Sequence, residues 1–430
     1  MDHGLNTGAL AVLAACLVLW GAVSDRLVRW NISAPTAFVV LGVATSHGPV
    51  HLVDVRLHSS TILTVAELTL AIVLFADAAR VNVRAVREEV GVSARLLAVG
   101  LPLTIGAGTA VAFGLLNGTD LWVAAAIGAI VAPTDAALGA PIVQDSRLPN
   151  SLRRTLTIES GLNDGIATPF VNLFLAGALS AEALASQSVA GAAVDLLGGA
   201  ALGLSIGIAG AVVLRAGERA GWSTGVSHSL SVLALAILAY VTSIQAGTNG
   251  FVAAFVAGMA YGSARPGGER HLSFTEDAGE LLSLVMWFVF GAVMLVPGLE
   301  AAGWSDVLFA VVVLTAARMV PVALSLVRSG LDGRTVAFIG WFGPRGLASI
   351  VFGLLAIDSL DPAAGNVVLA ATVTTVALSV FAHGVSAAPL ARRYSARLAV
   401  PAQGAAGGGA ETPMIRTRAL SGHRRGAARA

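Results

Sequence analysis

Long apolar stretches recur along most of the chain and are separated by short polar connections. Each stretch is long enough to cross the ~30 Å hydrocarbon layer of a membrane as an α-helix. The pattern predicts about thirteen transmembrane helices. They are expected at residues 5–23, 31–49, 60–80, 91–116, 119–140, 152–178, 188–216, 226–246, 249–264, 274–297, 303–328, 334–357 and 365–390. The first stretch follows Asp2 and His3 and lacks a basic segment and a convincing cleavage site, so we interpret it as a span and not as a signal peptide.

The placement of arginine supports this arrangement. The connections that follow odd-numbered spans contain Arg26, Arg29, Arg80, Arg84, Arg87, Arg147, Arg153, Arg215, Arg219, Arg265, Arg270 and Arg328. The connections that follow even-numbered spans contain almost no arginine, and Arg56 is the exception. The positive-inside rule produces such an alternation. It predicts a multi-pass plasma-membrane protein with its N-terminus outside the cell and its C-terminus in the cytoplasm.

The composition fits a membrane protein and excludes several other classes. Of 430 residues, 56% are hydrophobic and 12% are charged, and the mean hydropathy is +0.81. A soluble domain carries about twice that charged fraction. The net charge of +1 gives no reason to expect a nucleic-acid partner, and the single Cys16 excludes an intrachain disulfide and a cysteine-based metal site. Because metalloprotease, serine-hydrolase and phosphate-loop motifs do not occur, we expect neither an enzyme nor a bound cofactor.

The end of the chain differs from the rest. From about residue 400 onward the sequence is rich in Gly, Ala and Arg, and such a segment cannot bury a hydrophobic core. We therefore expect a transmembrane domain at residues 1–395 and a disordered, basic cytoplasmic tail at residues 396–430. The tail is either solvated or in contact with anionic lipid.

The strongest group of polar residues lies in the sixth span, within the run Glu159-Ser160-Gly161-Leu162-Asn163-Asp164. Ionisable side chains inside a membrane are costly and are candidates for function. On a helix, Ser160 and Asp164 share one face, and Glu159 and Asn163 share the adjacent face. This polar stripe predicts an ion site with Asp164 at its centre. A polar network that only holds helices together is the alternative.

Two other spans are interrupted. In the fifth span, Pro133 removes a backbone donor, so we expect the helix to break at Thr134 and Asp135. Such breaks free backbone carbonyls, which secondary transporters use to bind cations. Asp135 can also cap the next helical segment, and both interpretations can hold.

The twelfth span contains the run Gly343-Pro344-Arg345-Gly346. A buried arginine needs a carboxylate partner, and Glu159 is the natural candidate, which would leave Asp164 free for ion chemistry. An Arg345 that reaches the membrane surface is the alternative. The fifth and twelfth spans hold corresponding positions if spans one to six and eight to thirteen form an inverted repeat around a linker span. We therefore expect an all-α membrane protein with two interrupted, crossing helices.

Further ionisable residues lie near this predicted site. Asp77, at the end of the third span, lines an ion path or pairs with Arg80, and Glu67 lies nearer the middle of the same span. Arg318 is either a second buried cation beside the site or a counter-ion for an acid such as Glu280.

The runs at Pro133-Thr134-Asp135, at residues 159–165 and at Gly343-Pro344-Arg345-Gly346 resemble those of the cation:proton antiporter-1 family, the group of NhaP and sodium/proton exchangers. The resemblance extends over about residues 5–395. It implies that Asp164 binds a monovalent cation and a proton alternately, that oxygens of Thr134 and Ser160 contact the cation, and that Asp135 supports the site. It also implies a Glu159–Arg345 ion pair and a homodimer.

Two positions refine what the resemblance implies. Asn163 stands where electrogenic relatives have a second Asp, which implies electroneutral exchange of one cation for one proton. NhaP-type members often have an acid directly after a Leu-Phe pair in the third span, whereas here Ala76 stands at that position and Asp77 follows. An offset of one residue turns a side chain by ~100° around a helix.

The sequence thus predicts a secondary antiporter that exchanges Na⁺, K⁺ or Li⁺ for H⁺ across the plasma membrane. Ionised Asp164 binds the cation and protonated Asp164 releases it, while a core domain moves against a dimerisation domain. A cation channel is one alternative, but the sequence contains no run that resembles a selectivity filter. Another ion-coupled symporter is the second alternative.

Overall fold

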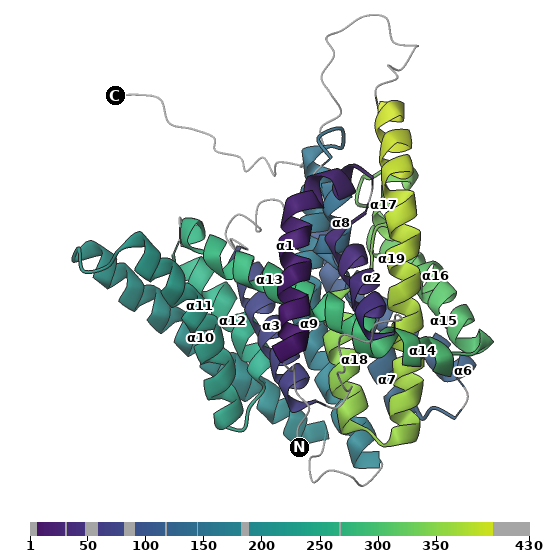
Figure 1. Cartoon of the computed structure of the whole chain (residues 1–430), viewed down its shortest axis with the longest axis horizontal. Helices are drawn as coiled ribbons and strands as arrows, with labels where there is room; N and C mark the ends of the chain where they lie inside the picture. Colours follow the sequence, from purple (N-terminus) through teal and green to yellow (C-terminus); the bar gives the residue numbers. More distant parts are fainter. Residues whose placement is uncertain are drawn as a thin grey trace, which may run out of the picture.

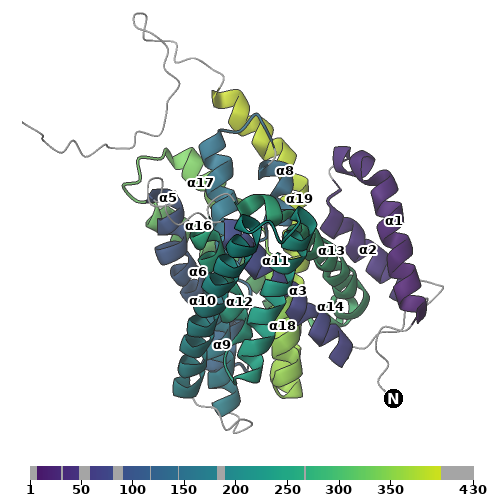
Figure 2. The same ribbon diagram turned by 90° about the vertical axis from the view of Figure 1, so that its left-hand side faces the viewer.

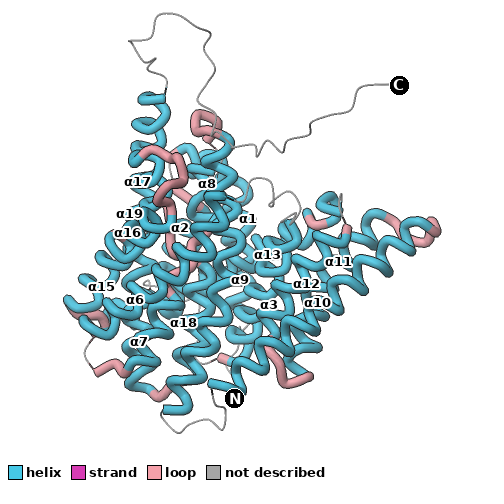
Figure 3. Tube along the Cα trace, turned by 180° about the vertical axis from the view of Figure 1, so that it is seen from behind, coloured by secondary structure: helices cyan, strands magenta, loops and turns pink. Residues whose placement is uncertain are grey.

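The computed structural model describes residues 7–30, 32–47, 59–80, 91–116, 118–143, 145–181, 189–265 and 268–398. All regular elements in these residues are helical, and none of them is a strand (Figure 3). Arg56, Arg84, Arg87 and all of the predicted tail after residue 398 lie outside the described residues. The boundary between transmembrane domain and tail therefore stays a prediction.

The helices follow one another along the described chain, and Figure 1 shows α10, α11 and α12 on one side of the molecule and α15, α16 and α19 on the other. Their bounds are α1 Thr7–Arg29, α2 Ala34–Ser46, α3 Ser60–Arg80, α5 Gly91–Arg95, η1 Leu96–Gly100, α6 Leu101–Leu115, α7 Leu121–Ile130, α8 Ala136–Val143, α9 Asn150–Ala181, α10 Val189–Arg219, α11 Gly225–Gln245, α12 Gly250–Ala264, η2 Gly268–His271, α13 Ser273–Val289, η3 Phe290–Met294, α14 Leu295–Ala301, α15 Trp304–Leu314, α16 Ala316–Ser325, α17 Gly333–Trp341, α18 Leu347–Ser359 and α19 Pro362–Leu398.

The prediction of an all-α membrane protein is confirmed. Among the described residues, 8 helical stretches are long and apolar enough to cross a membrane, and shorter apolar helices accompany them. Each predicted span overlaps one helix or a series of consecutive helical pieces. Two series contain a π-helical turn, η1 and η3, which the hydrophobic pattern does not predict. The number of thirteen crossings stays a prediction.

Side chains with oxygen acceptors fix the start of several helices. At α7, one carboxylate oxygen of Asp120 accepts the backbone N–H groups of Trp122 at 2.5 Å and Val123 at 3.1 Å. Thr224, Asn249 and Asp332 cap α11, α12 and α17 in the same way. Because a helix begins with unpaired N–H groups, these caps satisfy donors that would otherwise be exposed.

Glycines allow α12 to approach its neighbours closely. A Cβ atom added to Gly258 or to Gly262 would lie 2.2 Å from the carbonyl oxygen of Phe75 or of Ala79, both on α3. On its other side, α12 meets α10 through Gly203 and similar positions. Small residues that let backbones touch are the usual means by which transmembrane helices associate. The backbones of α3 and α10 therefore lie in close contact with the backbone of α12.

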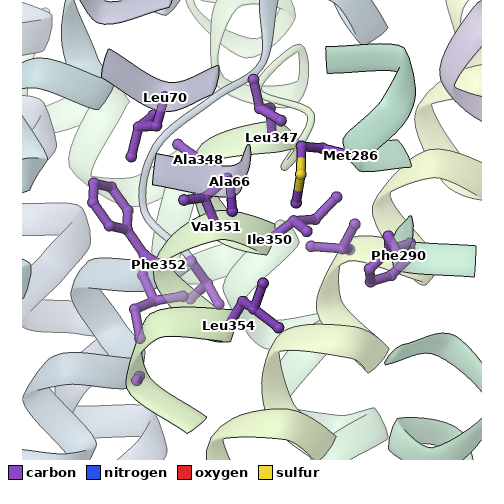
Figure 4. Close-up of a cluster of buried hydrophobic side chains, with 14 of the residues drawn as sticks. Ala66, Leu70, Met286, Phe290, Leu347, Ala348, Ile350, Val351, Phe352 and Leu354 are labelled. Carbon is purple, nitrogen blue, oxygen red and sulfur yellow. The ribbon is translucent and has the colours of Figure 1, made fainter. Parts of the chain in front are cut away.

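The half-helix α18 is anchored deep in the apolar core. Figure 4 shows Val351 of α18 beside Ala66 of α3, and Leu347 of α18 beside Met286 of α13. Its whole first two turns are buried. The first half of α18 is thus fixed by hydrophobic contacts on several sides.

The first helix lies at the edge of the molecule. It packs against α2, and Figure 2 shows these two helices beside the main bundle. Apolar residues such as Val18, with 73% of its surface exposed, and Leu19, with 60%, face outward from α1. An apolar outer face is what contact with lipid or with a second membrane protein requires.

The close contact between α3 and α12 gives a first prediction. Replacing Gly258 with Ala forces a methyl group against a backbone carbonyl that cannot turn away, so we expect a destabilisation of about 1–3 kcal/mol. Gly106→Ala is the matched control, because a Cβ at that position meets nothing within 4 Å. Thermal unfolding in detergent, followed by tryptophan fluorescence, should give a lower Tm for Gly258→Ala only. Equal Tm values for the two variants would contradict the packing described.

Candidate ion-binding site

Two helices are interrupted, as the sequence predicts. Residues 131–135 separate α7 from α8, and residues 342–346 separate α17 from α18. Pro133 and Pro344 lie inside these breaks, and neither has an N–H group to continue a helix. Each break leaves free carbonyl groups at the end of one half-helix and free N–H groups at the start of the next.

Asp135 caps two half-helices at once. Its Oδ1 atom accepts the N–H of Leu138 in α8 at 3.0 Å, and its Oδ2 atom accepts the N–H of Leu347 in α18 at 2.8 Å. Its own N–H donates to the carbonyl oxygen of Pro344 at 2.7 Å. The capping interpretation of Asp135 is confirmed, and the carboxylate lies where two helix dipoles favour a negative charge.

Arg345 serves the opposite end of the first break. Its side chain is fully buried, and Nη1 donates to the carbonyl oxygens of Ala132 and, at 3.2 Å, of Pro133. The Ser349 hydroxyl donates to the carbonyl of Ile130 at 2.7 Å. The carbonyls predicted to be free for a cation are therefore partly occupied by this guanidinium. Each break thus gives the other a charged side chain that satisfies its backbone groups.

The predicted ion pair between Glu159 and Arg345 is wrong. The partner of Glu159 is Arg318, whose Nη2 atom lies 2.6 Å from Glu159 Oε1, with only 1% and 2% of the two side chains exposed. The physical reason is the direction in which each arginine side chain extends. Arg318 enters from α16, which starts after a non-helical Thr315, while the guanidinium of Arg345 is turned toward the carbonyls of the first break. Arg345 interacts with Glu159 only through its charge at longer range.

The polar run of α9 meets the first break through Thr134. The Thr134 hydroxyl lies 3.1 Å from the Ser160 hydroxyl, and Asn163 Nδ2 donates to Thr134 Oγ1 at 2.5 Å. Asp164 is 8% exposed, and its Oδ1 atom has no hydrogen-bond partner in the part of the chain that the structure describes. Four of the predicted site residues are thus brought together, with one buried carboxylate oxygen left without a donor.

The structure places Asp77 beside this cluster. A Cβ atom added to Gly161 would lie 3.7 Å from the Cβ and Cγ atoms of Asp77, and the Asp77 charge acts on Asp164. The alternative pairing partner, Arg80, instead forms an ion pair with Glu276. Asp77 therefore remains available to the site despite its shift by one residue.

The other two ion-path candidates have different positions. Glu67 precedes Asp77 by ten residues, or ~15 Å of helix, and interacts with the Tyr240 hydroxyl. The structure does not bring it to the Asp164 cluster. Arg318 is the buried cation that pairs with Glu159, and Glu280, its other predicted partner, is exposed.

Comparison with known proteins agrees with this architecture. The family model described as "Sodium/hydrogen exchanger, transmembrane" matches residues 12–393. The chain is 28% identical over 349 residues to the K⁺/H⁺ antiporter NhaP2 of Shewanella sp. strain ANA-3, covering 80% of this chain and 59% of the relative. It is 26% identical over 355 residues to the K⁺/H⁺ antiporter NhaP of Alkalimonas amylolytica, covering 80% of this chain and 60% of the relative.

Similarity is also found to a fungal protein and to a solved structure. A probable Na⁺/H⁺ antiporter of Schizosaccharomyces pombe is 29% identical over 256 residues, which are 55% of this chain and 33% of the relative. The chain thus spans less than two thirds of the length of each of these relatives. The structure of the sodium proton antiporter MjNhaP1 from Methanocaldococcus jannaschii at pH 8 superimposes with a TM-score of 0.71 at 18% identity, covering 87% of this chain and 98% of that one.

The corrected ion pair gives a second prediction. Replacing Arg318 with Met leaves Glu159 buried without a partner, so we expect the free energy of unfolding to fall by about 3–5 kcal/mol. The double variant Arg318→Met/Glu159→Gln has no buried charge left at this pair and should lose less than the two single changes added together. Denaturant unfolding of the two single variants and the double variant measures this coupling.

The matched control is the cycle that combines Arg345→Met with Glu159→Gln. Because these two side chains share no direct bond and interact only through charge at longer range, their coupling should be smaller than that of Arg318 with Glu159. A coupling that is larger for Arg345 than for Arg318 would contradict the pairing described.

Proposed function

The chain belongs to the sodium/hydrogen exchanger family, and on this premise we propose that it exchanges a monovalent cation for a proton across the membrane. The observation that carries the proposal is the buried Asp164 carboxylate, which has an oxygen without a hydrogen-bond partner among the described residues. An unsatisfied carboxylate oxygen in a membrane interior is costly unless a cation or a proton completes it. Na⁺, K⁺ and Li⁺ are the candidate cations.

We propose that Asp164, Ser160 and Thr134 hold the cation. Each hydroxyl has one donor and two acceptor positions. When Thr134 accepts the amide of Asn163 and donates to Ser160, both hydroxyl oxygens still have a lone pair for a cation. Asn163 then acts by orienting Thr134, and Asp135 acts by fixing the break that carries Thr134.

The surrounding charges favour Asp164 as the group that changes its state. Glu159 is bound to Arg318, while Asp135 and Arg345 are engaged with the ends of the half-helices. Ionised Asp164 binds the cation, and a proton on the same carboxylate releases it. Because Asn163 is neutral, Asp164 is the one residue of this adjacent pair that can bind a cation or a proton. One cation is therefore exchanged for one proton, and the exchange is electroneutral.

Alternating access is the mode of transport that we propose for this site, which lies between two groups of helices. Gly161 of α9 faces Asp77 of α3, and α3 belongs to the close stack with α12. We propose that α6, α7, α9 and α16–α19 move against this stack, which opens the site to each side in turn. Asp77 then lines the way of the cation to Asp164.

The setting of the protein is the last part of the proposal. We propose a homodimer in the plasma membrane, as the resemblance implies, with the N-terminus outside and the C-terminus in the cytoplasm, as the arginine pattern favours. A cation channel is disfavoured because Arg318 and Arg345, both buried, stand beside the site and oppose the passage of a continuous cation current.

A third prediction tests the carboxylate. Asp164→Asn keeps the size of the side chain and removes its charge, so we expect cation-driven proton flux in proteoliposomes to vanish for Na⁺, K⁺ and Li⁺ alike. Asp25→Asn is the matched control, because Asp25 is 86% exposed on α1 and pairs only with its neighbour Arg29 among the residues described. Flux at the wild-type rate in Asp164→Asn would overturn the assignment.

A further inference from the structure

A second polar group covers the break between α17 and α18 from the side of α19. Ser379 is fully buried and His383 is 3% exposed. The Ser379 hydroxyl accepts the backbone N–H of Arg345 at 2.7 Å and lies 3.1 Å from His383 Nδ1. His383 Nε2 lies 2.9 Å from the carbonyl oxygen of Trp341. Trp341 is the last residue of α17, so the two side chains connect the two sides of the break.

The partners of the ring restrict its hydrogen-bonding state. Nε2 faces the carbonyl oxygen of Trp341, and Nδ1 lies 2.9 Å from the carbonyl oxygen of Ser379 as well as near the Ser379 hydroxyl. A carbonyl can only accept, so a neutral ring, which has one N–H, bonds one of these two carbonyls. With the hydrogen on Nε2, the ring donates to Trp341 and Nδ1 accepts the Ser379 hydroxyl, whose oxygen accepts the Arg345 N–H. This tautomer gives an unbroken series of hydrogen bonds from the Trp341 carbonyl through His383 and Ser379 to the Arg345 amide.

The charges around His383 support the neutral ring. The charges that act on the ring, among the described residues, are those of the cations Arg345, from the break itself, and Arg318, from α16. The other faces of the ring meet the aromatic rings of Trp341 and Phe342, with centroids at 5.4 and 6.5 Å. A second positive charge here would be repelled by both arginines.

We propose that His383 is a positioning residue of the exchange site, which acts by holding Arg345 in place. Arg345 bonds the carbonyls of Ala132 and Pro133, directly before Thr134, so a shift of its backbone would displace a hydroxyl that faces the cation. The inference rests on the proposed function, because it assigns His383 to that same site. A histidine that only fills space would not need bonds on both ring nitrogens.

The test compares three variants in proteoliposomes. His383→Phe keeps the ring volume and removes both bonds, so the competent arrangement of the break becomes less populated. We expect the KM for the cation to rise about tenfold, the equivalent of two ordinary hydrogen bonds, with little change in the maximal rate. His383→Gln keeps a donor near the Nε2 position and should restore most of the affinity.

The matched control is Ser386→Ala. Ser386 also lies on α19 and accepts a hydrogen bond from Trp341 at 2.9 Å, but from the indole Nε1 and not from the backbone. Its KM should equal that of the wild type. An unchanged KM in His383→Phe, or an equal rise in Ser386→Ala, would overturn the proposal. If His383→Phe does not fold, His383→Asn takes its place, because it also removes the bond to Trp341.

A second measurement does not depend on transport. Because His383 and Ser379 belong to one series of bonds, the Tm of the purified double variant Ser379→Ala/His383→Phe should be no lower than that of the more affected single variant. Tm losses that simply add would refute the proposed bridge. If the wild type shows no exchange, the proposed function fails, and the Tm comparison still decides whether the bridge exists.

Discussion

The site depends on one reciprocal interaction, in which a charged side chain of each interrupted helix bonds backbone groups of the other. A break inside a membrane leaves backbone groups without water to satisfy them, at a cost of several kcal/mol for each group. Asp135 of the first break accepts the N–H of Leu347 at the start of α18, and Arg345 of the second break donates to the carbonyls of Ala132 and Pro133 inside the first break. Each break thus satisfies backbone groups of the other.

This reciprocal bonding determines which partners remain for the other buried charged residues. Since Arg345 is engaged with carbonyls, Glu159 needs another cation, and Arg318 reaches it from α16. The irregular turn at Thr315 lets α16 start where its arginine points inward. Asp164, in contrast to Glu159, has no arginine partner among the described residues, and its Oδ1 atom accepts no hydrogen bond there. The functional group is thus defined by what its neighbours already bind.

The sequence predicts local features of this arrangement and misses the long-range ones. Proline and glycine within apolar runs predict both breaks, and spacing on a helix predicts that Ser160 and Asp164 share a face. The partner of Glu159 could not be predicted, because Arg318 and Arg345 are both arginines within apolar spans and only the folded chain decides which one reaches it. The bonds of Ser379 and His383 across the second break could not be predicted for the same reason, since the sequence does not indicate which groups a polar residue in a long span will contact.

The central claim is that one carboxylate holds either a cation or a proton, and proton release on cation binding tests it most directly. Na⁺, K⁺ or Li⁺ chloride would be added to the purified protein in weakly buffered detergent solution with a pH indicator, with choline chloride as the reference. The account predicts release of about one proton per chain, and none from Asp164→Asn. Cation binding without proton release, or equal release from the variant, would contradict it.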